Sequence, residues 1–106
     1  MLRNNIKIGY LVFGGGDNTL GMEIIVASIK DAFPDLQLVG LVDHSTAKHV
    51  DILLVSLYWY KNIYDFIQFL NTAGIDPRKK KPIIIIGGMA ALNPFILSGY
   101  FHYAVL

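Results

Sequence analysis

The sequence Ile83-Ile84-Ile85-Ile86-Gly87-Gly88 decides the fold class of this chain. Four consecutive β-branched residues have no polar alternation, which predicts a strand that is buried on both faces. Strands of this kind belong to parallel sheets covered by helices on both sides. The two glycines follow directly, and in open α/β sheets ligands bind beyond the carboxyl ends of the strands. We therefore expect Gly87 and Gly88 to form the floor of a ligand site.

Strand and helix patterns alternate along the rest of the chain. Helices are expected at residues 19–33, ended by Pro34, and after the Tyr58-Trp59-Tyr60 turn to about Ala73, ended by Gly74. A short helix is expected at 93–99. Residues at helical spacing form an apolar face on each long helix: Met22, Ile25, Val26, Ile29 and Phe33 on the first, and Ile63, Phe66, Ile67 and Leu70 on the second. The other strands are expected at residues 6–13, 36–42, 51–57 and 103–106.

This alternation, with right-handed crossovers, predicts an α/β fold: a flavodoxin-like (Rossmann-like) three-layer sandwich with a five-stranded parallel sheet of order 2-1-3-4-5. The linker at residues 43–50 is short for a parallel crossover, and Ser45 is expected to cap a single helical turn there. One edge of the sheet then gathers the loops at residues 14–18, 58–60 and 87–93. The opposite edge receives Arg78 to Lys81, His49 and His102.

Composition narrows the function classes. The chain has 106 residues, enough for one domain, with 54% apolar and 16% charged residues. It has no cysteine, which excludes disulfides and iron–sulfur ligation within this segment. A net charge of +1 gives no reason to expect nucleic acid or membrane partners, and we expect a cytoplasmic location. A final strand without a covering helix leaves apolar surface exposed, so we expect residues 1–106 to be an N-terminal part of a longer protein.

The turn Gly14-Gly15-Gly16-Asp17-Asn18 resembles phosphate-binding loops but fails both of their motifs. Met22 and Glu23 stand where a P-loop needs Lys and Ser or Thr, and Thr19 stands where the dinucleotide fingerprint needs its third glycine. Two interpretations remain: a tight glycine turn without a ligand, or a loop whose backbone approaches a ligand at a helix N-terminus. No paired carboxylates, nucleophilic triad or metal-ligand cluster is recognisable, so we expect no catalytic and no metal-binding residue in this segment.

Aromatic residues gather at the end of the third predicted strand. Tyr58-Trp59-Tyr60, with Tyr64 one turn later, could stack on a planar ligand, cover a partner domain or fill the core. Ser56 precedes them, and its hydroxyl is expected to bond either locally or to a bound ligand. His44 is most simply a polar residue at the rim of the same edge. The basic run at residues 78–81 is most simply a solvated loop.

Together, Asp51 to Ser56, the Tyr58-Trp59-Tyr60 turn, Ile83 to Gly88 and Asn93-Pro94 resemble the cobalamin-binding (B12-binding) domain that precedes the catalytic barrel in many radical S-adenosylmethionine enzymes. The resemblance covers Ile6 to Leu106. It implies cobalamin as the cofactor, and a downstream radical S-adenosylmethionine domain of the same chain that holds the iron–sulfur cluster and S-adenosylmethionine. The cofactor-facing positions that it implies are Gly14, Gly15, Gly16, Asp17, Asn18, Ser56, Tyr58, Trp59, Gly87, Gly88, Met89 and Asn93.

The sequence departs from cobalamin domains of methyltransferases and mutases, which carry Asp-x-His-x-x-Gly after the first strand. Here the turn from Asp17 to Gly21 is one residue shorter and has no histidine, so this loop offers no lower ligand to cobalt. Tyr58 also replaces the leucine of a related Ser-x-Leu motif. Two alternatives therefore stand beside the cobalamin domain: a ligand-free α/β scaffold or domain-interaction module, and a flavin- or nucleotide-binding module.

Overall fold

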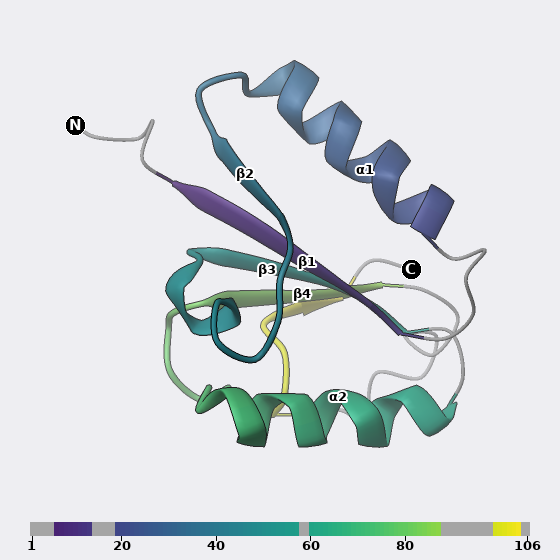
Figure 1. Ribbon diagram of the computed structural model, residues 1–106, viewed down its shortest axis with the longest axis vertical. Helices are drawn as coiled ribbons and strands as arrows, with labels where there is room; N and C mark the ends of the chain where they lie inside the picture. The colour runs from purple at the N-terminus through teal and green to yellow at the C-terminus, as the bar shows by residue number, and fades with distance from the viewer. Residues whose placement is uncertain (1–5, 14–18, 58–59, 88–98, 105–106) are drawn as a thin grey trace.

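The computed structural model describes residues 6–13, 19–57, 60–87 and 99–104 of the chain (Figure 1). The elements in chain order are β1 (Lys7–Phe13), α1 (Thr19–Ala32), β2 (Gln37–Leu41), the 3-10 turn η3 (Ala47–His49), β3 (Ile52–Leu57), α2 (Tyr60–Ala73), β4 (Ile83–Gly87) and β5 (Tyr103–Ala104). All five predicted strands and both long helices are confirmed, and their described ends shift by no more than one residue. Residues 105–106 of the last predicted strand lie outside the described residues. The short helix predicted at residues 93–99 falls almost entirely outside the described residues.

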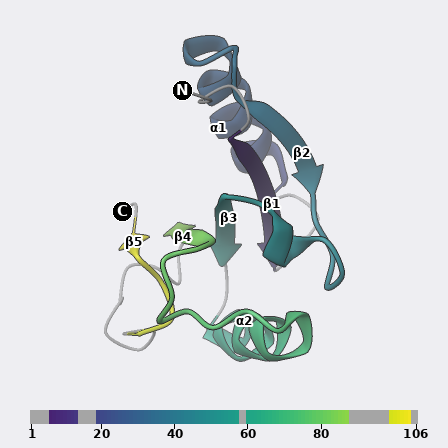
Figure 2. The same cartoon turned by 90° about the vertical axis from the view of Figure 1, so that its left-hand side faces the viewer.

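The five strands form one parallel sheet of order β2-β1-β3-β4-β5, as predicted. The helices lie on opposite faces of the sheet, so the molecule has three layers (Figures 1 and 2). This arrangement is an α/β, flavodoxin-like fold. Because all strands run in the same direction, their carboxyl ends meet at one edge of the sheet and their amino ends at the other.

The face toward α2 carries the main core. Phe66 of α2 is completely buried, and it packs with sheet residues whose side chains are also fully covered: Leu53, Leu57, Ile84 and Ile86. The predicted α2 face is confirmed for Ile63, Phe66 and Leu70, while Ile67 is only partly buried. Phe69, which the helical spacing did not assign to that face, is buried as well. Burial of each large apolar side chain contributes about 1.5–3 kcal/mol, so this layer dominates the stability.

The face toward α1 is covered less completely. Met22 and Val26 are buried against Ile8 and Leu54, and the small hollow beneath α1 has a volume of about 10 Å³, room for no more than one water molecule. The predicted apolar face of α1 is wrong at two positions, because Ile25 and Phe33 are 50% and 61% exposed. The covered stripe is therefore narrower than the helical spacing suggested.

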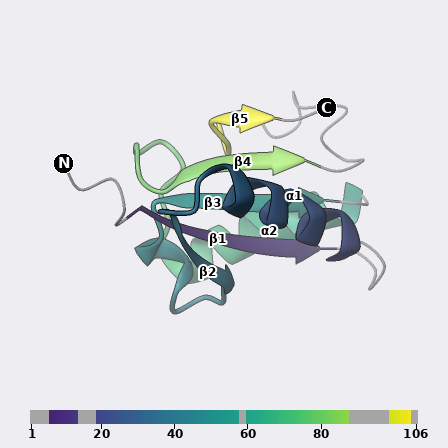
Figure 3. The ribbon, with the colours of Figure 1, turned by 90° about the horizontal axis from the view of Figure 1, so that it is seen from above.

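The prediction that β4 is buried on both faces is also wrong. Ile84 and Ile86 are fully buried, but Ile83 on the opposite face is 36% exposed and Ile85 is half-buried. The reason is the position of α1, which lies over β1 and β3 when the sheet is seen face-on (Figure 3). No helix of the described residues covers these two strands on that face.

Two glycines are required by the local geometry. A Cβ atom at Gly9 of β1 would lie 2.5 Å from Val42 Cγ1 and 3.0 Å from Val50 Cγ1, so only glycine lets the chain on either side of η3 pack against β1. Gly74 has φ +74° and ends α2 as predicted. The N–H groups of Gly74 and Ile75 donate to the carbonyl groups of Asn71 (3.3 Å) and Leu70 (3.0 Å), which is the Schellman motif.

The single helical turn predicted between β2 and β3 is present as η3, but Ser45 does not cap it. The N-cap residue is Thr46, and its side chain makes no capping hydrogen bond. Ser45 instead donates its backbone N–H (2.9 Å) and its hydroxyl (2.8 Å) to Asp43 Oδ1. The crossover is therefore shortened by a turn built on the Asp43 carboxylate.

Neither of the two described helices has both the length and the apolar character that are needed to cross a bilayer.

Candidate functional site at the carboxyl edge of the sheet

The site begins where β3 and β4 end side by side. Ser56 of β3 is the register partner of Gly87 of β4, and on its other side it pairs with Val12 of β1. Side chains alternate between the faces of a strand, and Leu54 faces α1, so Ser56 two residues later faces α1 as well. Gly87 follows Ile85 on that face in the same way. The sequence placed these residues at one edge, and the structure makes them direct neighbours.

The side chains of the three neighbouring positions become smaller from β1 to β3 to β4. Val12, Ser56 and Gly87 present an isopropyl group, a hydroxymethyl group and no side chain in turn. All three are half-buried. A flat ligand lying over the ends of β3 and β4 therefore meets backbone at β4 and a single polar side chain at β3.

We call Val12, Ser56 and Gly87 the shelf, and the hydroxyl of Ser56 is its polar group. Within the described part of the chain, Ser56 Oγ makes no hydrogen bond, although its side chain is half-buried. Partial burial removes some of the water around a hydroxyl, and this costs free energy unless a hydrogen-bond partner replaces the water. A serine hydroxyl can donate one hydrogen bond and accept two.

All of the other predicted site residues lie outside the described residues. These are Gly14, Gly15, Gly16, Asp17, Asn18, Tyr58, Trp59, Gly88, Met89 and Asn93. Their segments follow β1, β3 and β4, which all end at the edge that carries Ser56 and Gly87. Of the predicted positions, the structure describes Ser56 and Gly87.

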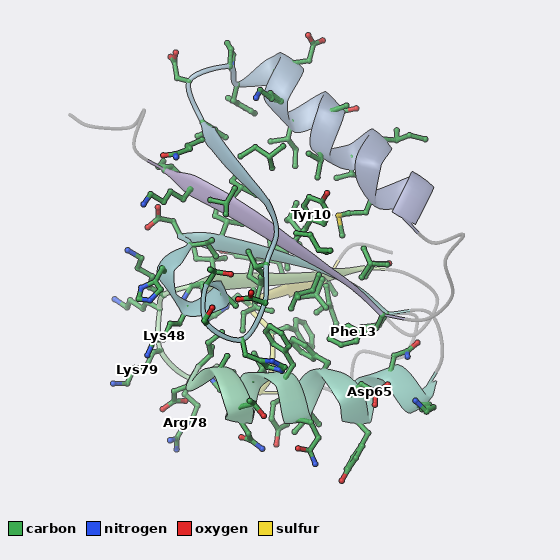
Figure 4. The ribbon with its side chains drawn as sticks, viewed as in Figure 1. Tyr10, Phe13, Lys48, Asp65, Arg78 and Lys79 are labelled. Carbon is green, nitrogen blue, oxygen red and sulfur yellow. The ribbon has the colours of Figure 1, made fainter. Side chains whose placement is uncertain are left out.

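The opposite face of the same edge is aromatic and closed. Phe13 at the end of β1 packs edge-on against Phe66 and Phe69 of α2, with ring centroids 6.4 and 6.3 Å apart (Figure 4). His44 stacks on Phe69 with a centroid distance of 4.5 Å. This contact places His44 on the α2 face, whereas Ser56 and Gly87 face α1. His44 is therefore separated from the shelf by the sheet itself.

Two further groups near this edge are turned away from the shelf. Tyr64 of α2 is 64% exposed, and its hydroxyl accepts a hydrogen bond from Gln68 Nε2 at 3.0 Å. Asp43, after β2, accepts four hydrogen bonds from Ser45 and Thr46. These bonds, first of all that from the Ser45 hydroxyl, lower the pKa of Asp43 below its ordinary value. The sequence signal for this turn is an Asp followed by His, Ser and Thr.

The amino edge of the sheet holds a polar network that sequence reasoning did not find. Asp51 accepts the backbone N–H of Lys7 and pairs with the Lys81 ammonium group, each at 2.8 Å. The Lys81 contact, followed by the Lys7 N–H, lowers the pKa of Asp51. His102 Nδ1 accepts the N–H of Ile84 at 2.8 Å, and Nε2 lies 3.0 Å from the carbonyl oxygen of Lys79. Since these partners are far apart in the sequence, no local pattern could reveal them.

In the described part of the chain, no group of three His, Asp or Glu side chains is arranged to hold a metal ion. Comparison with known proteins adds no relative: no protein-family model, curated protein or solved structure matches the chain.

Proposed function

We propose that this chain is a cobalamin-binding domain that holds the corrin ring over the carboxyl edge of β3 and β4, as part of a radical S-adenosylmethionine enzyme. The observation that carries the proposal is the pair Ser56 and Gly87. A half-buried hydroxyl without a hydrogen bond to any described residue, beside a position without a side chain, fits a large planar ligand. The resemblance of the sequence to cobalamin domains supplies the identity of that ligand.

The residues of the shelf take defined roles in this proposal. Gly87 lets the ring approach the backbone of β4, because any Cβ there stands on the face that the ligand covers. The Ser56 hydroxyl donates a hydrogen bond to an acceptor of the ligand or accepts one from its amide side chains. The loop at residues 14–18 and residues 58, 59, 88, 89 and 93 complete the contacts by resemblance. The bound group supplies the cobalt chemistry, and the radical site lies in a downstream domain of the same chain.

The ligand is held in this proposal without a histidine from below. The turn from Asp17 to Gly21 contains none, and His44 stacks on Phe69 on the other face of the sheet. The domain therefore acts as a platform: it binds, orients and shields the corrin, and it contributes no acid–base or nucleophilic group. A cytoplasmic setting is part of the same proposal, since the sequence has no cysteine.

The test is an equilibrium titration of the chain with hydroxocobalamin, followed by the quenching of Trp59 fluorescence and by the corrin spectrum. Ser56→Ala removes one hydrogen bond to the ligand, and we expect the Kd to rise by about 3- to 10-fold, which corresponds to about 1 kcal/mol. Ser28→Ala is the matched control, because Ser28 is exposed on α1 and distant from the shelf. Its Kd should equal that of the unaltered chain.

Flavin mononucleotide and ATP serve as competing ligands in the same titration. Saturable binding of either one, with no response to hydroxocobalamin, would replace the proposal by the flavin or nucleotide module. The absence of binding for all three compounds would leave the ligand-free scaffold as the function of the fold.

A further inference from the structure

The amino edge of the sheet carries most of the positive charge of the chain. Six of its nine lysines and arginines lie there, on η3, on β1 and in the segment before β4: Lys7, Lys48, Arg78, Lys79, Lys80 and Lys81. We refer to these six residues as the basic surface. Lys48, Arg78 and Lys79 are labelled at the same end of the molecule, opposite to Phe13 and Asp65 (Figure 4). The net charge of +1 hides this concentration, because eight acidic residues nearly balance the nine basic ones over the whole chain.

Among the described residues, two carboxylates form ion pairs with the basic surface. Asp51 pairs with Lys81 at 2.8 Å, and Asp76 pairs with Arg78 at 3.1 Å. Asp31 and Asp35 also lie at the amino edge of the sheet, but next to β2, where α1 ends and away from β4. The ammonium groups of the other four lysines of the basic surface have no ion-pair partner among the described residues, and all four side chains are exposed: Lys7, Lys48, Lys79 and Lys80.

The basic surface adjoins the uncovered apolar part of the sheet. Ile83 follows Lys81 by two residues and is 36% exposed, and Tyr103 at the start of β5 is 63% exposed. Tyr103 pairs with Ile85, so both exposed side chains stand on the face toward α1. The ring of His102 lies between the basic surface and β4, because it contacts the carbonyl oxygen of Lys79 and the N–H of Ile84. We call Ile83 and Tyr103 the apolar strip.

We propose that the basic surface and the apolar strip together dock an acidic amphipathic helix of a partner protein. Such a helix presents carboxylates and apolar side chains on neighbouring stripes, and it is complementary to both parts of this surface. The dimensions agree, because β1 and β4 are two strand spacings apart, about 10 Å, and two helical turns span about 11 Å. Carboxylates that are one or two turns apart on the partner helix can therefore reach lysines at both ends of the basic surface.

The apolar strip favours a protein over other polyanions. A phosphate backbone or a layer of anionic headgroups satisfies the lysines, but it offers no partner to an exposed isoleucine beside them. A protein segment covers Ile83 and Tyr103 and removes apolar surface from water at the same time. The docking surface lies at the edge opposite to Ser56 and Gly87, so a partner can bind while the shelf is occupied.

The first experiment measures fluorescence anisotropy of a labelled synthetic peptide of about 14 residues, with glutamate and leucine on adjacent helical stripes, at about 50 mM salt. The chain is compared with the variant Lys79→Glu/Lys80→Glu. The matched control is Lys30→Glu/Lys61→Glu, which changes the net charge equally at sites outside the basic surface. We expect the first variant to raise the Kd by at least about 10-fold and the control to change it by less than about 2-fold.

The second experiment tests the apolar strip with two tyrosines of equal exposure. Tyr103→Ser should raise the Kd for the peptide by about 3- to 10-fold, while Tyr64→Ser on α2 should leave it unchanged. A peptide with glutamine in place of glutamate should bind at least about 10-fold more weakly than the acidic peptide.

Three results would overturn the proposal. One is equal loss of peptide binding in the two charge variants, which indicates attraction by net charge alone. Another is the absence of any effect of Tyr103→Ser. The third is binding to phosphatidylserine vesicles or to a single-stranded oligonucleotide with no binding to the acidic peptide. None of these outcomes depends on cobalamin, so this proposal and the proposed cofactor site fail separately.

Discussion

The packing of η3 against β1 gives the sharpest prediction about the fold, and the substitution Gly9→Ala tests it. The added methyl group lies 2.5 Å from Val42 Cγ1 and 3.0 Å from Val50 Cγ1, both on side chains that are at least 95% buried. Overpacking of a core costs about 1–3 kcal/mol. Alanine recovers about 0.5–1 kcal/mol relative to glycine within a strand. We therefore expect a net loss of about 1–2 kcal/mol in the free energy of unfolding.

Urea unfolding followed by circular dichroism measures this loss, and a double-mutant cycle identifies its cause. Val42→Ala removes the methyl group that the new Cβ meets, at the expense of a cavity. In the double variant the two changes compensate, so the measured loss should be smaller than the sum of the single losses by about 1 kcal/mol. A neutral or stabilising Gly9→Ala, or strictly additive effects, would refute the close approach of these segments.

Three further predictions concern other parts of the fold. Phe66→Ala should lower the free energy of unfolding by about 3–5 kcal/mol, and Phe66→Leu by less than half of that, because Phe66 is fully buried against Phe13 and the sheet; urea unfolding distinguishes them. Gly74→Ala should cost about 1 kcal/mol, since φ is +74° at the end of α2, and an unchanged unfolding midpoint would contradict the Schellman motif. Asp51→Asn should cost about 1 kcal/mol at neutral pH. The lowered pKa of Asp51 stabilises the folded state above the ordinary value of 3.8, and this contribution is lost as the pH falls through the lowered pKa. The difference between the unaltered chain and Asp51→Asn should therefore be constant from about pH 5 to 7 and shrink below about pH 4; a difference that grows on acidification has the wrong sign.

The sheet order was predictable because its signals are local. The apolar runs of β3 and β4 indicate parallel strands, and Gly74 marks the end of α2 in any context. Right-handed crossovers then leave few arrangements of five parallel strands. The neighbourhood of Ser56 and Gly87 follows from the same rule, since both residues end adjacent strands.

The degree of burial could not be predicted in the same way. Ile83 and Ile85 belong to an uninterrupted apolar run, yet their exposure depends on where α1 lies relative to β4. Ile25 has the spacing of a core residue but falls outside the stripe that contacts the sheet. The exposure of these side chains depends on where whole helices and strands lie relative to one another. A local sequence pattern carries no information about those positions.

The contacts at the two edges were hidden for a different reason. The stacking of His44 on Phe69 and the pairing of Asp51 with Lys81 join residues that are distant in the sequence. Each is decided by the three-dimensional register of separate elements. The concentration of lysines at the amino edge likewise emerges only when η3, β1 and the segment before β4 are brought together by the fold.

The proposal that the carboxyl edge of β3 and β4 holds cobalamin can be tested by gel filtration of the chain with the cofactor. The chain is incubated with excess hydroxocobalamin and separated by gel filtration, and the protein peak is scanned for corrin absorbance. We expect corrin to elute with the protein at close to one equivalent per chain, and the variant Ser56→Ala to retain less corrin. A protein peak without corrin absorbance would contradict the account.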